Sequence, residues 1–149
     1  MLKKILLVED DPLLVKMYAA AFAHSGYDAH IAFNGEEGLV KLMEMKDDPP
    51  TVVVTDVMMP KMNGLEFIRQ LKADPNFKKI PVIVLTNLSG QTDATEALKL
   101  GAITYLVKSE YEPKEILAKI EEIMEAYSRG SNVPDVTVTV KDAKPDGGA

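Results

Sequence analysis

Short, mainly apolar runs alternate along the chain with longer segments in which apolar residues recur at helical spacing. Continuous apolar runs are typical of strands that are buried on both faces of a sheet. The expected strands cover residues 5–8, 28–32, 51–55, 80–85 and 103–107. The segments between and after them predict helices over about residues 13–23, 35–45, 65–74, 93–100 and 113–128.

Several element boundaries are marked by residues with a defined local effect. Pro12 suits the first turn of a helix, and Asp11 before it can cap the free amides. Gly26 ends this helix, and Asn34-Gly35 predicts a turn before the next one. Residues 47–50 end the second helix because their prolines cannot continue it. The apolar stripe expected on the first helix comprises Leu14, Met17, Tyr18, Ala21 and Phe22.

Five strands that alternate with five helices predict a parallel sheet, because right-handed crossovers place the helices on both of its faces. We therefore expect an α/β fold of three layers, formed by residues 1–128. The composition changes in residues 129–149. This tail is expected to be disordered or, because residues 136–140 alternate between valine and threonine, to add a strand to an exposed sheet edge.

The composition excludes several classes of protein. The formal net charge is −6 and no cluster of lysine and arginine offsets it, so we expect no direct contact with nucleic acid. The chain has no cysteine, which excludes disulfides, zinc–thiolate sites and thiol catalysis. The run at residues 5–8 is too short for a signal peptide, and no stretch is long enough to span a membrane. A cytoplasmic location is therefore expected.

Acidic residues follow two of the expected strands. Glu9, Asp10 and Asp11 come after the first strand, and Asp56 comes after the third. The carboxyl ends of parallel strands meet at one edge of the sheet, so these side chains are expected to lie close together. Gathered carboxylates raise each other's pKa unless a cation compensates. Hard oxygen ligands suit Mg²⁺, which is the expected cofactor.

Two further strand ends suggest phosphoryl chemistry. The fourth strand delivers Thr86, and the fifth delivers Lys108, to the same edge. A carboxylate can act as a nucleophile and form an aspartyl phosphate. A metal ion and a lysine ammonium on opposite sides would neutralise the phosphoryl oxygens, and a hydroxyl could hydrogen-bond to them. Taken singly, each residue could be structural, but their joint occurrence makes Asp56 a candidate phosphoacceptor.

Four segments match one known family, in its order and near its usual spacing. They are residues 5–11 (ILLVEDD), 56–60 (DVMMP) with 63–64 (NG), 84–86 (VLT), and 101–102 (GA) with 105–108 (YLVK). On these residues, the chain resembles the receiver domain of two-component response regulators over about residues 3–127. The resemblance implies a flavodoxin-like sheet with the strand order 2-1-3-4-5.

The resemblance also implies a role for each matching residue. Asp56 would be the phosphoacceptor, and Lys108 would bind a phosphoryl oxygen. Thr86 and Tyr105 would form a switch pair, in which the hydroxyl moves toward the phosphoryl group and the ring follows it inward. The implied Mg²⁺ ligands are Glu9, Asp10, Asp56 and the backbone carbonyl of Met58. A register shifted by one residue would make Asp11 the second member of the acidic pair instead of a helix cap.

Two positions depart from the family's pattern. Ser109 follows Lys108 where the family usually has proline, often with a cis bond. A cis bond before another residue costs about 3 kcal/mol, so the resemblance does not fix the geometry of this peptide. Asn87 follows Thr86 where a small residue is commoner, and its bulk is expected to restrict access to the phosphoryl site or to change the phosphoryl lifetime.

These inferences predict a signalling switch that assists only its own phosphorylation and dephosphorylation. The phosphodonor would be a sensor histidine kinase or a phosphotransfer protein. The signal would reach a downstream effector through the face of the fourth helix, fifth strand and fifth helix, and the chain could also form a homodimer. The segment after residue 128 is too short for an output domain, so we expect a stand-alone receiver or one piece of a longer regulator.

Two alternatives remain open at this point. The chain could be an interaction module that works without phosphorylation, although the site residues argue against this. It could also be a Mg²⁺-dependent phosphatase with an aspartate nucleophile. Such enzymes usually carry a second aspartate two residues after the nucleophile, and here Met58 occupies that place.

Overall fold

The computed structural model describes residues 3–87 and 91–130, and within them five parallel strands form one sheet in the order β2-β1-β3-β4-β5. The strands are β1 (Lys3–Val8), β2 (Tyr27–Ala32), β3 (Val52–Asp56), β4 (Val82–Thr86) and β5 (Thr104–Val107). The helices are α1 (Pro12–His24), α2 (Gly35–Glu44), α3 (Gly64–Ala73), α4 (Gln91–Leu100) and α5 (Pro113–Ser128), with the 3-10 helix η2 (Lys108–Glu110) before α5. The predicted fold and strand order are confirmed.

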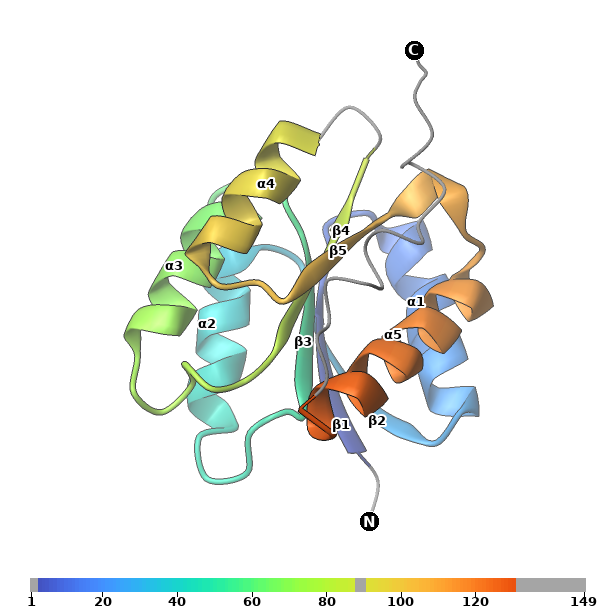
Figure 1. Cartoon of the computed structure of the whole chain (residues 1–149), viewed down its shortest axis with the longest axis horizontal. Coiled ribbons are helices and arrows are strands. Elements are labelled where there is room, and N and C mark those ends of the chain that lie inside the picture. The colour runs from blue at the N-terminus through green and yellow to red at the C-terminus, as the bar shows by residue number, and fades with distance from the viewer. Residues whose placement is uncertain (1–2, 88–90, 131–149) are drawn as a thin grey trace.

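Two hydrophobic clusters hold helices against opposite faces of the sheet. Helices α1 and α5 lie on one face, and α2, α3 and α4 lie on the other (Figure 1). Ile5 and Leu7 belong to the first cluster, while Leu6 and Val8 belong to the second. All four are fully buried, because successive side chains of a strand point to opposite faces and both faces are covered. The continuous apolar run of β1 is explained by this burial.

The element boundaries differ from the sequence prediction at a few places. Strand β4 begins at Val82 rather than at residue 80, since Pro81 has no N–H to donate to a neighbouring strand. The expected stripe of α1 is wrong at Met17, which is 41% exposed. Val15 is buried instead, because residues 15, 18 and 22 share the face that packs on the sheet.

Side chains cap three helices that begin at the carboxyl edge of the sheet. Asp11 Oδ1 accepts hydrogen bonds from the Leu13 and Leu14 amides at 2.9 and 3.4 Å, which confirms its predicted capping role. Asn34 and Asn63 each accept a hydrogen bond at 3.0 Å from the amide three residues further on. These caps satisfy amides that have no partner within the helix, and they fix where each helix starts.

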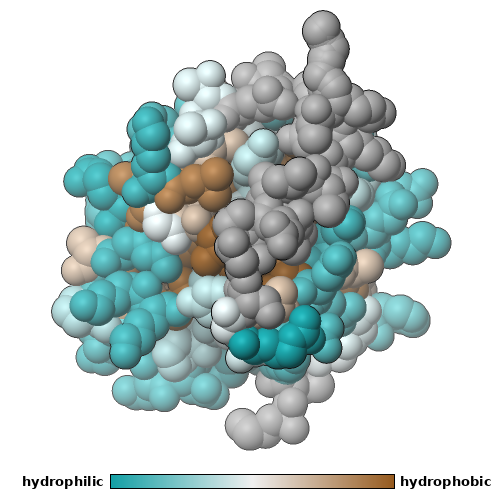
Figure 2. Space-filling view, in the orientation of Figure 1, coloured by the Kyte–Doolittle hydropathy of each residue, from teal (hydrophilic) through white to brown (hydrophobic). Residues whose placement is uncertain are grey.

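The outer surface of the helices is mainly hydrophilic on the face shown in Figure 2, and hydrophobic residues gather in its middle, between the helical layers. In residues 3–87 and 91–130, no helix has the length and apolar character needed to cross a bilayer. The expectation of a disordered or edge-strand tail falls on residues 131–149, which lie outside the described residues.

Candidate functional site

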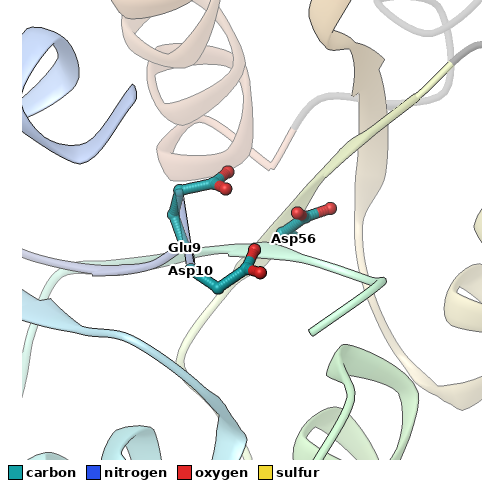
Figure 3. Close-up of side chains that lie close together, drawn as sticks. All are labelled: Glu9, Asp10 and Asp56. Atoms are coloured by element: carbon teal, nitrogen blue, oxygen red, sulfur yellow. The ribbon is translucent and has the colours of Figure 1, made fainter. Parts of the chain in front are cut away.

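Three carboxylates meet at the carboxyl edge of the sheet (Figure 3). Glu9 and Asp10 follow β1, and Asp56 is the last residue of β3, the strand beside β1. One carboxylate oxygen from each residue lies within 4.8 Å of the others. Glu9 and Asp56 are only 1% and 3% exposed, and Asp10 is more exposed than either. Glu9 and Asp56, which are 47 positions apart in the sequence, are therefore buried side by side.

Lys108, the first residue of η2, reaches into this carboxylate cluster. Its Nζ atom lies 3.0 Å from Glu9 Oε1 and 3.0 Å from Asp56 Oδ2. The lysine side chain is 11% exposed, so both ion pairs are largely shielded from solvent. Because β5 lies at the edge beyond β4, the lysine crosses the end of β4 to reach the carboxylates.

The charges of the cluster do not balance. Burial raises the pKa of Asp56, and Lys108 opposes this rise without cancelling it. Burial also raises the pKa of Glu9, with the Asp56 charge adding to the effect. Burial disfavours the charged form of Lys108, but Asp56 and Glu9 together hold its pKa above the ordinary value. The lysine is therefore charged at neutral pH, and the carboxylates remain in excess.

Backbone amides orient both buried carboxylates. Asp56 Oδ1 accepts a hydrogen bond from the Val57 amide at 2.7 Å, and Glu9 Oε2 accepts one from the Asp11 amide at 3.1 Å. Each carboxylate thus presents one oxygen to an amide and the other to Lys108. These two contacts orient the Asp56 carboxylate.

The chemistry of these donors fits a hard divalent cation. Mg²⁺ prefers oxygen ligands, and three carboxylates supply them within one small space. If all three are ionised, one lysine leaves a net charge of about −2, which a divalent cation would neutralise. Met58 follows Asp56 by two residues and is 61% exposed.

Thr86 and Tyr105 lie on β4 and β5, the two strands that follow β3 in the sheet. Thr86 ends β4, one residue beyond Leu85, which pairs with Asp56 in the sheet. The buried Thr86 hydroxyl donates a hydrogen bond to the Asn87 carbonyl at 3.2 Å. Tyr105 is half-buried and packs against both hydrophobic clusters. The residues of the predicted switch pair therefore lie on neighbouring strands, on the β5 side of Asp56.

The two departures from the family's pattern flank the site. Residues Lys108–Glu110 form one 3-10 turn, and no peptide bond in the described residues is cis. Lys108 therefore reaches the carboxylates from a trans backbone. Asn87 is exposed, and the three residues after it lie outside the described part of the chain. Its effect on access to Asp56 stays a prediction.

A family model of the response regulator receiver domain matches residues 5–121. The chain belongs to the response regulator receiver family. It is 32% identical over 120 residues to the DNA-binding response regulator MtrA of Mycolicibacterium smegmatis, covering 80% of this chain and 50% of that protein. It is 35% identical over 122 residues to the alkaline phosphatase synthesis transcriptional regulatory protein PhoP of Bacillus subtilis, covering 82% of this chain and 48% of that protein. The receiver thus spans about half the length of these curated relatives.

The receiver is also similar in structure to the chemotaxis response regulator CheY4 of Vibrio cholerae. The two share 27% sequence identity with a TM-score of 0.74, and the match covers 82% of this chain and 98% of that chain. Receiver domains act as signalling switches in two-component systems, and they typically bind Mg²⁺ at an acidic pocket. Glu9, Asp10 and Asp56 form an acidic cluster in this receiver.

One contact beside the site was not predicted from the sequence. The Gly35 amide donates a hydrogen bond at 2.9 Å to the carbonyl of Met62, in the loop between β3 and α3. The sequence marks Asn34-Gly35 only as a turn, since no side-chain pattern links a backbone amide to a carbonyl 27 residues away. The hydrogen bonds from the Asp11 and Val57 amides to Glu9 and Asp56 were not predicted from the sequence either.

Proposed function

We propose that the protein is a phosphorylation-dependent switch in which Asp56 accepts a phosphoryl group from a sensor histidine kinase or a phosphotransfer protein. The observation that carries the proposal is the pair of 3.0 Å contacts between Lys108 Nζ and the carboxylates of Asp56 and Glu9. These contacts support the proposal, because a buried lysine beside Asp56 could neutralise the phosphoryl oxygens of the modified residue.

The chemistry begins with a carboxylate oxygen of Asp56. This oxygen attacks the phosphorus atom of the donor, and the bond between phosphorus and the donor's imidazole nitrogen breaks as the acyl phosphate forms. Water later cleaves the acyl phosphate, which restores the carboxylate and releases inorganic phosphate. Lys108 neutralises a phosphoryl oxygen on one side throughout.

The proposed metal ligands are Glu9, Asp10, Asp56 and the backbone carbonyl of Met58. When bound, Mg²⁺ would supply positive charge that offsets the phosphoryl oxygens. The excess of carboxylates over lysine supports this assignment, because a dication relieves the repulsion that burial leaves unscreened.

The proposed output passes from Asp56 to the face formed by α4, β5 and α5. The Thr86 hydroxyl, now bonded to the Asn87 carbonyl, would turn toward a phosphoryl oxygen, and the half-buried Tyr105 ring would move inward. That face would then bind a downstream effector or a second copy of the chain. The role is signalling, and the proposed chemistry is limited to the domain's own phosphorylation and dephosphorylation.

The test is intact mass after incubation with Mg²⁺ and acetyl phosphate. The wild type should gain a single phosphate, and the Asp56→Asn variant should gain none. Asp11→Asn is the matched control, because Asp11 lies nearby but caps α1, a role that asparagine also fills. This control should gain the phosphate as the wild type does.

Two outcomes contradict the proposal. If neither the wild type nor the control gains a phosphate while circular dichroism shows them folded, the protein is better explained as an interaction module that works without phosphorylation. If Asp56→Asn still gains the phosphate, another residue is the acceptor.

A further inference from the structure

The loop that follows Asp56, residues 57–63, is held by two backbone hydrogen bonds. The Gly64 amide donates to the Val57 carbonyl at 2.8 Å and closes the base of the loop. The Gly35 amide, at the first residue of α2, donates to the Met62 carbonyl at 2.9 Å. The loop carries Met58, the proposed carbonyl ligand of Mg²⁺, so α2 is tied to the metal site through Gly35.

The hydrogen bond from Gly35 to Met62 can form only because Gly35 has no side chain. A Cβ atom at Gly35 would lie 2.8 Å from the Met62 carbonyl oxygen and 2.8 Å from Met62 Cγ. Side-chain carbons essentially never approach other heavy atoms that closely, and the backbone oxygen cannot rotate away as a side chain can. Alanine at this position would therefore push the loop and α2 apart.

The start of α2 is itself fixed, so the loop has to absorb the displacement. Asn34 is 5% exposed and caps the helix through the Glu37 amide at 3.0 Å. Glu37 Oε1 in turn accepts a hydrogen bond from the Phe33 amide at 2.8 Å. These two contacts, one on each side of the cap, hold the first turn of α2, whose Gly35 amide donates to the loop.

The loop has little freedom between Met62 and Met58. Pro60 has a restricted φ angle, and Lys61 adopts a left-handed conformation with φ of 65°. The side chains of Met59 and Met62 pack against the hydrophobic cluster beneath the loop. A displacement of the backbone at Met62 therefore also shifts the backbone at Met58.

We propose that Gly35 is a positioning residue for the Mg²⁺ site, because its close approach to Met62 fixes the loop that presents the Met58 carbonyl. This inference rests on the proposed Mg²⁺ ligands. Gly35 touches no ligand itself and acts through the loop. Substitutions that disturb the support of a metal ligand typically weaken metal binding by about 10- to 100-fold.

The first test compares Mg²⁺ binding to Gly35→Ala and Gly38→Ala by titration calorimetry. Gly38 lies on the same helix, and a Cβ there would meet the Phe67 ring at 2.7 Å instead of the loop. Both variants should be less stable to urea than the wild type. Gly35→Ala should bind Mg²⁺ about tenfold more weakly, whereas Gly38→Ala should bind within about twofold of the wild type.

A second measurement needs no variant and remains informative if Gly35→Ala fails to fold. If the hydrogen bond from the Gly35 amide to the Met62 carbonyl favours Mg²⁺ binding, Mg²⁺ binding must stabilise that hydrogen bond by the same factor. Exchange of the Gly35 amide hydrogen should therefore slow when Mg²⁺ is added. The Gly38 amide, bonded within α2 to the Asn34 carbonyl at 3.0 Å, should respond less.

The outcomes separate this inference from the proposed function. Wild-type Mg²⁺ affinity in a folded Gly35→Ala protein would overturn the role of Gly35 and leave the metal site intact. An equal response of the Gly35 and Gly38 amides to Mg²⁺ would do the same. Failure of the wild type to bind Mg²⁺ would overturn both proposals.

Discussion

The two edges of the sheet carry similar ion pairs in different surroundings. At the carboxyl edge, Lys108 lies 3.0 Å from Asp56 and is 11% exposed. At the amino edge, Lys4 lies 2.6 Å from Asp48, but the two side chains are 27% and 67% exposed. The shorter ion pair is the one that water and salt screen more strongly. Burial, rather than distance, therefore decides which pair affects the fold.

The surroundings differ because of what lies beyond each edge. The carboxyl edge is closed by the starts of the helices and by η2, so its charges face one another. The amino edge opens into a cleft of about 360 Å³ that is lined by Lys3, Tyr27, Thr51, Val52, Glu121, Met124, Glu125 and Ser128. Lys4 and Asp48 do not line this cleft, but they are 27% and 67% exposed, so their charges stay hydrated and can change with a small effect on stability.

The largest effect is expected when Lys108 is replaced by methionine. Lys108→Met should lower the free energy of unfolding by about 3 kcal/mol at pH 7 without Mg²⁺, because it leaves two buried carboxylates uncompensated. Urea denaturation measures this change. A loss of less than about 1 kcal/mol would show that the buried pairs are no more important than exposed ones.

A smaller effect of opposite sign is expected when Asp56 is replaced by asparagine. Burial raises the pKa of Asp56 in the folded protein, so ionisation of this carboxyl destabilises the fold. That destabilisation is absent below the unfolded pKa of about 3.9, and it is complete above the raised folded pKa. Asp56→Asn should therefore stabilise the Mg²⁺-free protein at pH 7, by on the order of 1 kcal/mol.

The pH profile distinguishes this cause from a simple packing effect. The difference in unfolding free energy between Asp56→Asn and the wild type should grow as the pH rises from about 4 toward 7. Urea denaturation at several pH values provides the comparison. A difference that stays constant with pH would contradict the argument from buried charge.

The smallest effect is expected at the amino edge, from the same chemical change that is proposed for Lys108. Lys4→Met should change the free energy of unfolding by less than about 0.5 kcal/mol, because its partner Asp48 is largely hydrated. The change should shrink further in added salt. If Lys4→Met and Lys108→Met prove equally destabilising, the contrast between the two edges is wrong.

The sequence was sufficient to predict the fold. The run at Ile5 and its neighbours is apolar without alternation, which is explained by a strand covered on both faces. The order of the sheet followed from the family resemblance, and the structure confirms it. The errors were local. Met17 is exposed because several sides of α1 carry apolar residues, and the side that meets the sheet depends on how the helix packs.

The candidate site was predictable in its membership but not in its contacts. Glu9, Asp56 and Lys108 each lie at the end of a parallel strand, and this topology alone brings them to one edge. The sequence does not show that Lys108 bridges both carboxylates, or that the Asp11 and Val57 amides orient them. Nearly every residue carries a backbone amide, so residue type cannot identify the ones that serve a site.

Residue type and order by themselves determined the elements, the parallel sheet and the chemistry available at its carboxyl edge, because hydrophobic periodicity and strand-end position are properties of the chain. Only the tertiary structure decided the burial of Lys108, the excess of negative charge and the tie from Gly35 to Met62. These features arise from packing between segments far apart in sequence. Their strength depends on how completely the surrounding elements exclude water.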